Sequence, residues 1–338
     1  MIDGNARQAF SALGSTAQVD LAMQGVALIY NPASGQYSAR RNEAVQSALA
    51  VFREAGVVAE AYVCGTPEGA TARAQEAIRK GADTVIACGG DGTVHAILQS
   101  LVGTEVALGV IPLGTANALA ANLGLIGPPA KMARRLLDAA PVRIPVGRIH
   151  FNDHDGNPAS RYFLVAAGVG ADALLMARLD AGLKRRFGYA LYLLEAARIW
   201  VTNPFPLFKA TFIVKGSDAP LVAEISQLLA VRVRSFGGAL NKLAPGATLH
   251  SEGLHLMAFR TRNRMRYMRF LLAVLFGRHT FSNDIDLLKT VSVECRARTG
   301  SPAPIFVEAD GEVLGTLPVR MEVIPQALTL LIPANARP

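Results

Sequence analysis

The chain has 338 residues, of which 51% are hydrophobic and 18% charged, so it can bury a core and intrinsic disorder of the whole chain is excluded. At about 150 residues per domain, this length predicts roughly two domains. Lysine and arginine outnumber aspartate and glutamate by 34 to 26, and the net charge of +8 favours an anionic partner: a nucleotide, a nucleic acid or an acidic membrane surface.

The three cysteines, Cys64, Cys88 and Cys295, are widely spaced and form no CxxC pair. This spacing disfavours a disulfide framework or a cysteine zinc site and favours a reducing, cytoplasmic setting. No signal peptide is visible at the N-terminus, and the longest clean apolar run, residues 270–276, is far too short to cross a bilayer. We therefore expect a cytoplasmic protein that is soluble or attached to a membrane from one side.

Residues 1–24 show weak periodicity and are interpreted as a mobile arm. From residue 25 onward, short apolar runs alternate with segments of helical periodicity. We expect strands at residues 26–30, 57–63, 84–88 and 106–111. Helices are expected around residues 45–52, from residue 66, over 94–101 and after 115, with Thr66 as an N-cap and Pro67 at the first helical position. This alternation predicts an α/β domain whose parallel sheet carries helices on both faces.

The pattern changes near Pro141. Short β-like runs follow at residues 146–151, 161–167, 208–214, 224–233 and 290–295, interrupted by two helices near 188–201 and 264–276. Residues 153–157 have the composition of a hairpin turn. The second half of the chain is therefore expected to form a mostly antiparallel β domain.

Three glycine-containing motifs follow the first, third and fourth predicted strands: NPASG at residues 31–35, GGDGT at 89–93 and PLGTAN at 112–117. Open α/β sheets bind ligands at the carboxyl ends of their strands. Glycine lets the backbone approach phosphates, and helix N-termini direct free N–H groups at an anion. Asp91 lies where a carboxylate could hold Mg²⁺ bridging such phosphates. The absence of GxxxxGK[ST] and GxGxxG motifs disfavours P-loop and Rossmann folds.

The order and spacing of these motifs resemble those of the diacylglycerol kinase-like lipid kinases, the superfamily that includes sphingosine and ceramide kinases, and the soluble bacterial members look most similar. The resemblance continues to about residue 332 through segments 168–172, 183–189, 236–238, 244–247 and 310–312. One departure is the SEGLH sequence at residues 251–255, where many bacterial members read DDGxxD. The metal that some relatives bind there is therefore not carried over, because His255 is a poor ligand for Mg²⁺, although Glu252 offers an oxygen.

The resemblance implies transfer of the γ-phosphoryl group of ATP, with Mg²⁺, to a hydroxyl of a membrane lipid such as diacylglycerol, ceramide or a sphingoid base. It also implies a three-layer α/β nucleotide-binding domain over residues 25–143 together with about 326–338, and a β-sandwich lipid-binding domain over 144–325. The residues expected to bind the nucleotide lie in the three motifs and at one predicted helix cap: Asn31, Pro32, Ser34, Gly35, Thr66, Gly89, Gly90, Gly92, Thr93, Gly114, Thr115 and Asn117.

Asp91, Asp310 and Glu312 are the candidate catalytic carboxylates. We assign Asp310 as the general base and Asp91 to the metal–nucleotide site, with the reverse assignment left open. Glu312, two residues from Asp310, is expected on the same side of an extended strand, where it would point at the same metal. The alternative for Asp310-Gly311 is an ordinary hairpin turn.

Asp172 is the candidate for binding the hydroxyl of the lipid head group, because the residues around it are apolar. The alternative is a helix N-cap after Gly170. The six histidines form no metal-ligand spacing and are interpreted as structural or surface residues.

The strongest membrane signal is the segment 260–279, which contains six arginines and no acid, with apolar residues at helical intervals. A basic helix with an apolar face is typical of an interfacial element, and each cation near anionic lipid contributes about 1 kcal/mol. The predicted membrane surface consists of Arg262, Arg264, Arg266 and Arg269. The alternative is a helix packed on the second domain with a solvated basic face. We expect peripheral attachment to the inner face of a membrane, and a homodimer is compatible with the sequence.

Three other functions were weighed. An NAD kinase shares the GGDGT signature, but the motifs at 112–117 and 310–312 look like those of lipid kinases. A nucleotide-responsive membrane-binding protein without catalysis is a second alternative, which the intact Asp91, Asp310 and Glu312 disfavour. Binding of nucleic acid is not expected, because the chain lacks a helix-turn-helix, zinc-finger or RNA-binding aromatic signature.

Overall fold

The computed structural model describes residues 23–32, 38–153, 155–178, 194–214, 216, 219–236, 246–275, 285–300, 303–334 and 336. The predicted mobile arm lies outside these residues except for its last two positions. Ser34, Gly35 and the segment 183–189 also lie outside them.

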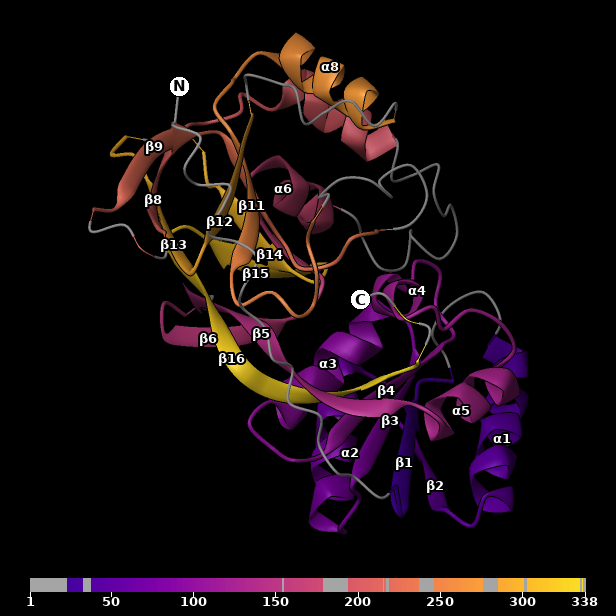
Figure 1. The fold of residues 1–338 in the computed structure, drawn as a ribbon. Coiled ribbons are helices and arrows are strands. Elements are labelled where there is room, and N and C mark those ends of the chain that lie inside the picture. Colours follow the sequence, from indigo (N-terminus) through magenta and orange to yellow (C-terminus); the bar gives the residue numbers. More distant parts are fainter. Residues whose placement is uncertain are drawn as a thin grey trace.

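Four parallel strands form the centre of the first half of the molecule, in the order β2-β1-β3-β4. These are β1 (Gly25–Tyr30), β2 (Val58–Val63), β3 (Thr84–Gly89) and β4 (Ala107–Pro112). The helices are α1 (Ser38–Glu54), α2 (Pro67–Arg79), α3 (Asp91–Leu101), α4 (Ala118–Asn122) and α5 (Pro129–Leu137). α1 packs with α5 and α2 with α3, and these two pairs cover opposite faces of the sheet (Figure 1). The predicted three-layer α/β arrangement is confirmed.

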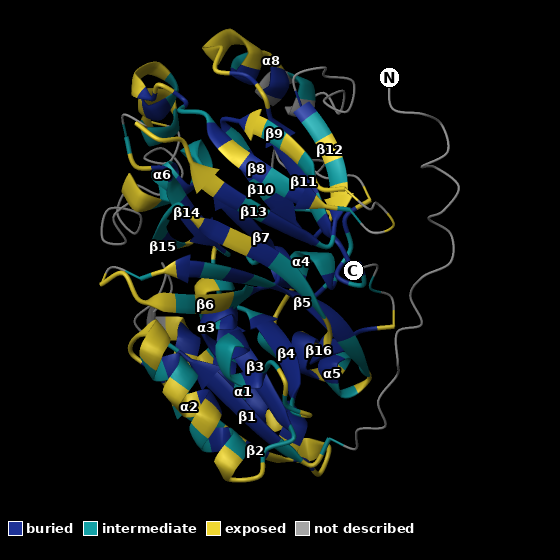
Figure 2. Ribbon diagram, turned by 90° about the vertical axis from the view of Figure 1, so that its left-hand side faces the viewer, coloured by how far each residue is buried: buried dark blue, intermediate teal, exposed yellow. Residues whose placement is uncertain are grey.

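Local sequence explains these elements well. All six residues of β3 are buried, which is expected of a strand whose sheet is covered on both faces. α2 begins where Thr66 Oγ1 accepts a hydrogen bond of 3.1 Å from the amide of Gly69, and Pro67 takes the first helical position. Figure 2 shows the buried strands enclosed by helices whose outer faces are exposed.

Two long strands join the two halves of the molecule. β5 (Ala140–Asn152) and β16 (Val319–Ile332) pair antiparallel along most of their length, and β16 also pairs in parallel with β4 at Thr329 and Leu330. The strand predicted at residues 146–151 was therefore too short. The first half of β5 was not predicted, because a proline such as Pro145 normally argues against a strand. In the structure this proline falls where the register between β5 and β16 shifts, and a strand tolerates the missing N–H at such a position.

The second half is a sandwich of two sheets. One layer continues the first sheet through β16 and comprises β6 (Pro158–Phe163), β8 (Phe208–Ile213), β9 (Leu221–Ile225) and β13 (Ser292–Ala297). The other has the order β12-β11-β10-β7-β14-β15 and comprises β7 (Ala166–Val169), β10 (Gln227–Val231), β11 (Leu254–Phe259), β12 (Ile285–Thr290), β14 (Phe306–Ala309) and β15 (Glu312–Thr316). Phe163, Phe208, Phe212 and Leu256 pack in the core between the layers. The predicted antiparallel β-sandwich is confirmed.

Two strands expected to be continuous are interrupted. The predicted strand 161–167 divides into β6 and β7, because the amides of Leu164 and Val165 bond to the carboxylate of Asp310 and not to a neighbouring strand. The predicted strand 224–233 divides into β9 and β10 at Ser226, whose hydroxyl bonds to the carbonyl of Phe259 at 3.2 Å.

The remaining helices lie at one end of the sandwich: α6 (Ala171–Arg178), the helical residues 194–202 and α8 (Arg264–Leu275) (Figure 1). In the part of the chain that the structure describes, no helix combines the length and apolarity needed to cross a bilayer. Cys64, Cys88 and Cys295 are buried free thiols, as expected from their spacing.

Candidate functional site

The loops that follow β3 and β4 are packed backbone against backbone. The amide of Leu113 donates to the carbonyl of Gly89 at 2.9 Å. A Cβ atom on Gly114 would lie 2.4 Å from the Cα of Gly90, and one on Gly89 would lie 2.3 Å from Oγ1 of Thr93. These glycines are therefore required by close approach alone, whatever ligand the loops bind.

Asp91 and Asn117 hold the third motif in place. Asn117 has a φ of 50°, and its side-chain amide accepts from the backbone N–H of Gly114 at 3.0 Å and donates to the Gly114 carbonyl at 2.8 Å. The backbone amides of Asn117, Ala118 and Leu119 lie close enough to the carboxylate of Asp91 to stabilise its charged form. Burial raises the pKa of Asp91, and these amides oppose the increase.

Arg41 is a residue at this edge that the sequence analysis missed. Its side chain is buried in the structure, where Nη1 donates to the carbonyl of Asn31 at 3.0 Å and Nη2 to the carbonyl of Leu113 at 2.6 Å. Arg41 thus ties the first motif to the third and places a positive charge where phosphates are expected. Nothing in the sequence distinguished it from the other arginines of its helix, because its partners lie on two other loops.

The other predicted nucleotide residues are placed as follows. Asn31 ends β1, and its Nδ2 atom donates to the carbonyl of Gly65 at 3.0 Å. Thr66 is an exposed N-cap, so its structural role accounts for its position. Gly92 and Thr115 are exposed at the same edge, beside the start of α3 and of α4 respectively. The described motif residues therefore converge on one edge of the parallel sheet.

Asp310 is a buried carboxylate held by three backbone amides. Its Oδ2 atom accepts from Leu164 N at 2.9 Å, and its Oδ1 atom accepts from Val165 N at 2.8 Å and Ala166 N at 3.0 Å. The side chain is only 5% exposed. Asp310 and Gly311 have φ values of 48° and 85°, so they form a hairpin turn between β14 and β15. The prediction that residues 310–312 form an extended strand is therefore wrong, and the alternative, a hairpin turn, is confirmed.

Asp310 and Glu312 nevertheless converge, because both face His95 of α3. His95 Nδ1 lies 3.3 Å from Asp310 Oδ2, and His95 Nε2 lies 2.9 Å from Glu312 Oε2. Burial alone would lower the pKa of His95, but the two carboxylates raise it to about 9, so the ring is a cation at neutral pH. The sequence analysis missed this role. Its one available signal was that His95 is four positions from Asp91, on the same helix face.

Glu312 is the most accessible of the three candidate carboxylates, with a side chain that is 49% exposed. The ion pair with His95, whose Nε2 atom lies 2.9 Å away, lowers the pKa of Glu312 and keeps it ionised at neutral pH. Among the described residues, no group of three or more His, Cys, Asp or Glu side chains is arranged to hold a metal ion. The donor set at this edge fits Mg²⁺ that is bound mainly by nucleotide phosphates, since such ions commonly take only one or two protein carboxylates.

Asp172, in the first turn of α6, is a buried carboxylate without a direct hydrogen bond on either oxygen. Burial raises its pKa to about 6, although the amides of Asp172 and Ala173 lie near enough to oppose this. The Oδ2 atom of Asp172 lies directly over Gly168: a Cβ atom built on this glycine would be only 1.8 Å from it. Asp172 begins no helix as a cap, because α6 starts one residue earlier. An unpaired buried acceptor of this kind suits a hydroxyl donor from a ligand.

The segment that departs from the family pattern, residues 251–255, lies beside an internal cation. Arg232 is fully buried, and its Nη2 atom donates to the carbonyls of Pro145 at 2.7 Å and Leu249 at 3.1 Å. His255 Nε2 lies 3.2 Å from Ser251 Oγ, and burial lowers the pKa of His255 to about 4. A guanidinium beside a neutral histidine does not fit a metal site.

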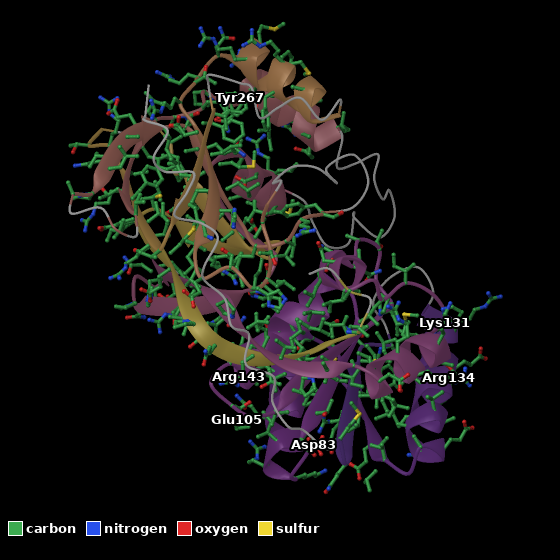
Figure 3. The ribbon with its side chains drawn as sticks, viewed as in Figure 1. Asp83, Glu105, Lys131, Arg134, Arg143 and Tyr267 are labelled. Atoms are coloured by element: carbon green, nitrogen blue, oxygen red, sulfur yellow. The ribbon has the colours of Figure 1, made fainter. Side chains whose placement is uncertain are left out.

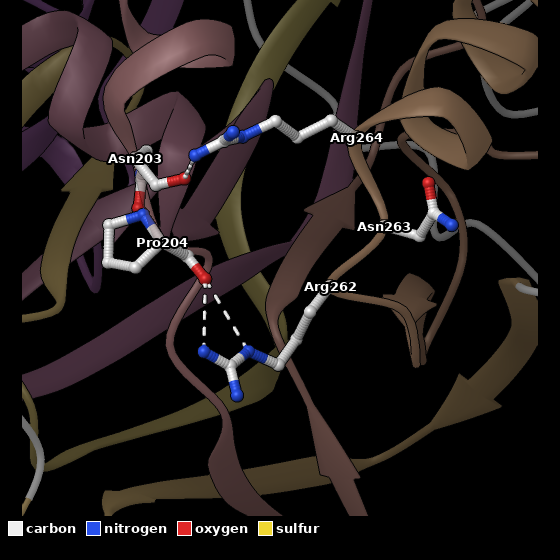
Figure 4. Close-up of a pocket in the computed structure, with 5 residues that line it drawn as sticks. All are labelled: Asn203, Pro204, Arg262, Asn263 and Arg264. Carbon is white, nitrogen blue, oxygen red and sulfur yellow. Dashed lines mark hydrogen bonds between the residues drawn. The ribbon is translucent and has the colours of Figure 1, made fainter.

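Two of the four predicted membrane arginines line a shallow polar hollow of about 490 Å³ at the N-terminus of α8. Figure 4 shows Arg262 donating to the carbonyl of Pro204 and Arg264 to that of Asn203, at 3.5 Å and 3.4 Å. Arg266 and Arg269 are exposed farther along α8.

The apolar face of α8 packs inward. Tyr267 stacks on Phe259 with ring centroids 5.2 Å apart, and Phe270 meets Phe259 edge-on. Ala171, the neighbour of Asp172, packs against the cluster that contains Tyr267, so α8 lies close to the start of α6. Figure 3 places Tyr267 at the end of the molecule opposite Asp83 and Lys131. The helix is therefore packed on the second domain, as in the alternative interpretation. The four predicted membrane arginines are exposed: Arg262, Arg264, Arg266 and Arg269.

Comparisons with known proteins agree with this geometry. Residues 25–149 match the diacylglycerol kinase catalytic domain, and residues 164–332 match the YegS C-terminal NAD kinase beta sandwich-like domain. The chain is 30% identical to the diacylglycerol kinase of Mycobacterium tuberculosis over 314 residues, which cover 92% of this chain and 96% of that protein. It is 27% identical to the diacylglycerol kinase of Bacillus subtilis over 299 residues, covering 88% and 92%.

Solved structures show the same fold. A diacylglycerol kinase from Bacillus anthracis superposes with a TM-score of 0.64 at 18% identity, covering 93% of this chain and 98% of that one. Yeast NADH kinase complexed with NADH superposes with a TM-score of 0.51 at 11% identity, covering 92% and 84%. At these identities the likeness concerns the fold alone.

Proposed function

This chain belongs to the diacylglycerol kinase-like lipid kinase family and is a kinase, and we propose that it transfers the γ-phosphoryl group of ATP to a hydroxyl group of a membrane lipid. The observation that carries the proposal is the position of His95 between Asp310 and Glu312. His95 belongs to the helix that starts at the GGDGT motif, whereas both carboxylates belong to the β-sandwich. The nucleotide edge and the carboxylates of the second domain therefore form one site.

The nucleotide is proposed to lie along the edge formed by the three motifs. The N-terminus of α3 and the charge of Arg41 favour phosphate there. Asp91 and Glu312 would hold Mg²⁺, and the bound ion would neutralise charge on the phosphates. Positioning and charge neutralisation supply most of the rate enhancement in phosphoryl transfer, so a rigid, cationic edge is the main requirement.

The two carboxylates of the turn are suited to different tasks. Both oxygens of Asp310 already accept amide hydrogen bonds, and protonation would break them. We therefore assign Asp310 to holding His95 and the turn, which revises its assignment as general base. Glu312 is half-exposed and oriented by His95, and we assign it to Mg²⁺ beside Asp91, because a carboxylate whose pKa is lowered suits a metal ligand better than a base.

The lipid hydroxyl is proposed to donate to Asp172, whose buried carboxylate oxygens lack direct partners and whose raised pKa suits it to receive the proton. Asp172 lies at the start of α6, close to α8. Exposed apolar and basic residues lie at the α8 end of the sandwich. Leu194, Val201 and Met265 are 64%, 57% and 66% exposed, and Arg262 and Arg264 lie beside them. Apolar side chains flanked by arginines suit the interface of an anionic bilayer, so we propose peripheral attachment through this end.

The direct test is phosphoryl transfer from γ-labelled ATP, with Mg²⁺, to diacylglycerol, ceramide, a sphingoid base and phosphatidylglycerol in mixed micelles. The Glu312→Gln variant serves as the matched inactive control, and NAD is included as a competing acceptor because the yeast NADH kinase shares the fold. One labelled lipid, lost in the variant, supports the proposal and identifies the substrate. Labelled NAD without labelled lipid overturns it in favour of an NAD kinase.

A further inference from the structure

Glu308 is a buried carboxylic acid that the reaction described above does not use. It lies on β14, opposite Gly168 of β7, and is 6% exposed. Its Oε2 atom accepts a hydrogen bond of 2.7 Å from the amide of Gly311. Gly311 stands between Asp310 and Glu312. From the interior of the protein, Glu308 therefore fixes the turn that presents both side chains. The sequence analysis missed Glu308, although it precedes Asp310 by two positions.

The other oxygen of Glu308 faces Asp172. A Cβ atom on Gly168 would lie 1.8 Å from Asp172 Oδ2 and 2.9 Å from Glu308 Oε1. The two carboxyl groups therefore fill together the space that a side chain at residue 168 would occupy. This explains why β7 has a glycine at this position, where φ is ordinary and no turn is required.

The electrostatic surroundings favour one proton on this pair. Burial and the charge of Asp172 raise the pKa of Glu308 well above its ordinary value, and the charge of Asp310 acts in the same direction. His95 opposes the increase, and burial together with the charge of Asp172 raises the pKa of Tyr267 of α8. Because Glu308 Oε2 accepts from Gly311, a proton on Glu308 belongs on Oε1, directed toward Asp172.

We propose that Glu308 is a positioning residue for phosphoryl transfer: its carboxyl group links Asp172, where the lipid hydroxyl binds, to Gly311 in the turn that presents Asp310 and Glu312. The inference rests on the proposed lipid kinase activity. A single buried side chain thereby sets the distance between the group that binds and deprotonates the hydroxyl and the turn that presents the proposed Mg²⁺ ligand Glu312. Such distances matter because a misplacement of about 1 Å can cost on the order of 100-fold in rate.

Two substitutions distinguish a role of Glu308 in linking Asp172 to the turn from a role in packing alone. Glu308→Gln keeps an acceptor oxygen for Gly311 and offers an N–H to Asp172, whereas Glu308→Met keeps similar volume and neither polar contact. We expect Glu308→Met to lose on the order of 100-fold in kcat with an unchanged KM for ATP. Glu308→Gln should recover a substantial part of that loss. Glu105→Met, at a side chain that is 83% exposed, is the matched control and should keep wild-type kinetics.

The link between Glu308 and Asp172 is tested by a double-mutant cycle with Glu308→Gln and Asp172→Asn, read as kcat and lipid KM. This cycle decides the question even if Glu308→Met does not fold. Non-additive effects support the proposal. Additive effects, or wild-type kcat in Glu308→Met, overturn it while leaving lipid kinase activity intact. If the wild-type protein labels no lipid, the proposed function fails first and this positioning role fails with it.

Discussion

His95 and Asp310 are 215 positions apart in the sequence, yet His95 Nδ1 lies 3.3 Å from Asp310 Oδ2. This contact joins the helix that follows GGDGT to the turn between β14 and β15, and hence the nucleotide edge to the β-sandwich. Since Glu312 contacts the other ring nitrogen, one imidazolium orients two carboxylates from the same turn. The charge state of His95 should therefore control both stability and catalysis.

The first prediction concerns pH. The pKa of His95 in the folded protein, about 9, exceeds its unfolded value near 6.5, so the protonated ring stabilises the fold fully below about pH 6.5. This contribution is lost as pH rises from about 6.5 through 9, and amounts to at most about 3 kcal/mol. Urea unfolding from pH 6 to 9.5 should show the wild type losing stability relative to His95→Gln. Parallel curves for the two proteins would contradict a charged His95.

The second prediction separates Asp310 from Glu312. Asp310→Asn replaces an oxygen with an NH2 group that faces backbone N–H donors, and each unsatisfied buried donor costs about 1–3 kcal/mol. We therefore expect a lower Tm. Glu312→Gln removes one charge partner of His95 at a half-exposed side chain, so it should lower Tm less than Asp310→Asn does and lower kcat about 100-fold or more. Thermal unfolding and kinase assays on both variants check this, and an unchanged Tm in Asp310→Asn would contradict it.

The third prediction concerns the glycine motifs. Gly114→Ala should destabilise the nucleotide edge, because its Cβ would lie 2.4 Å from the Cα of Gly90. Gly92→Ala meets no atom within 4 Å and should fold like the wild type. If phosphates approach the backbone at Gly92, the KM for ATP should nevertheless rise in this variant. Thermal unfolding and ATP kinetics on the pair distinguish steric from ligand-related glycines, and equal Tm values for the two variants would refute the steric argument.

Local patterns predicted the parallel strands and the motif positions, because burial on both faces of a sheet and glycine after a strand leave direct traces in sequence. Arg41, His95 and Glu308 could not be found in this way, since their partners lie on distant elements. The Asp310-Gly311 turn had a local signal, because Asp-Gly is typical of hairpin turns, and the structure confirms this alternative over the extended strand. The break at Leu164 and Val165 arises from a carboxylate nearly 150 residues later, with separations of 146 and 145 positions.

The last prediction concerns membrane attachment through the end that carries α8. Arg262→Glu together with Arg264→Glu should weaken co-sedimentation with anionic vesicles, because each arginine contributes about 1 kcal/mol near anionic lipid and each glutamate is repelled. The matched control is Lys131→Glu with Arg134→Glu, which makes the same charge change on α5, far from Tyr267 (Figure 3).

Attachment should require anionic lipid and weaken with salt, since exposed charges are screened. Met265→Ser should also weaken attachment, because an exposed apolar side chain would no longer enter the interface. Equal binding by the two charge-reversal variants would mean that net charge alone attracts the protein, and would remove the α8 end as the attachment surface.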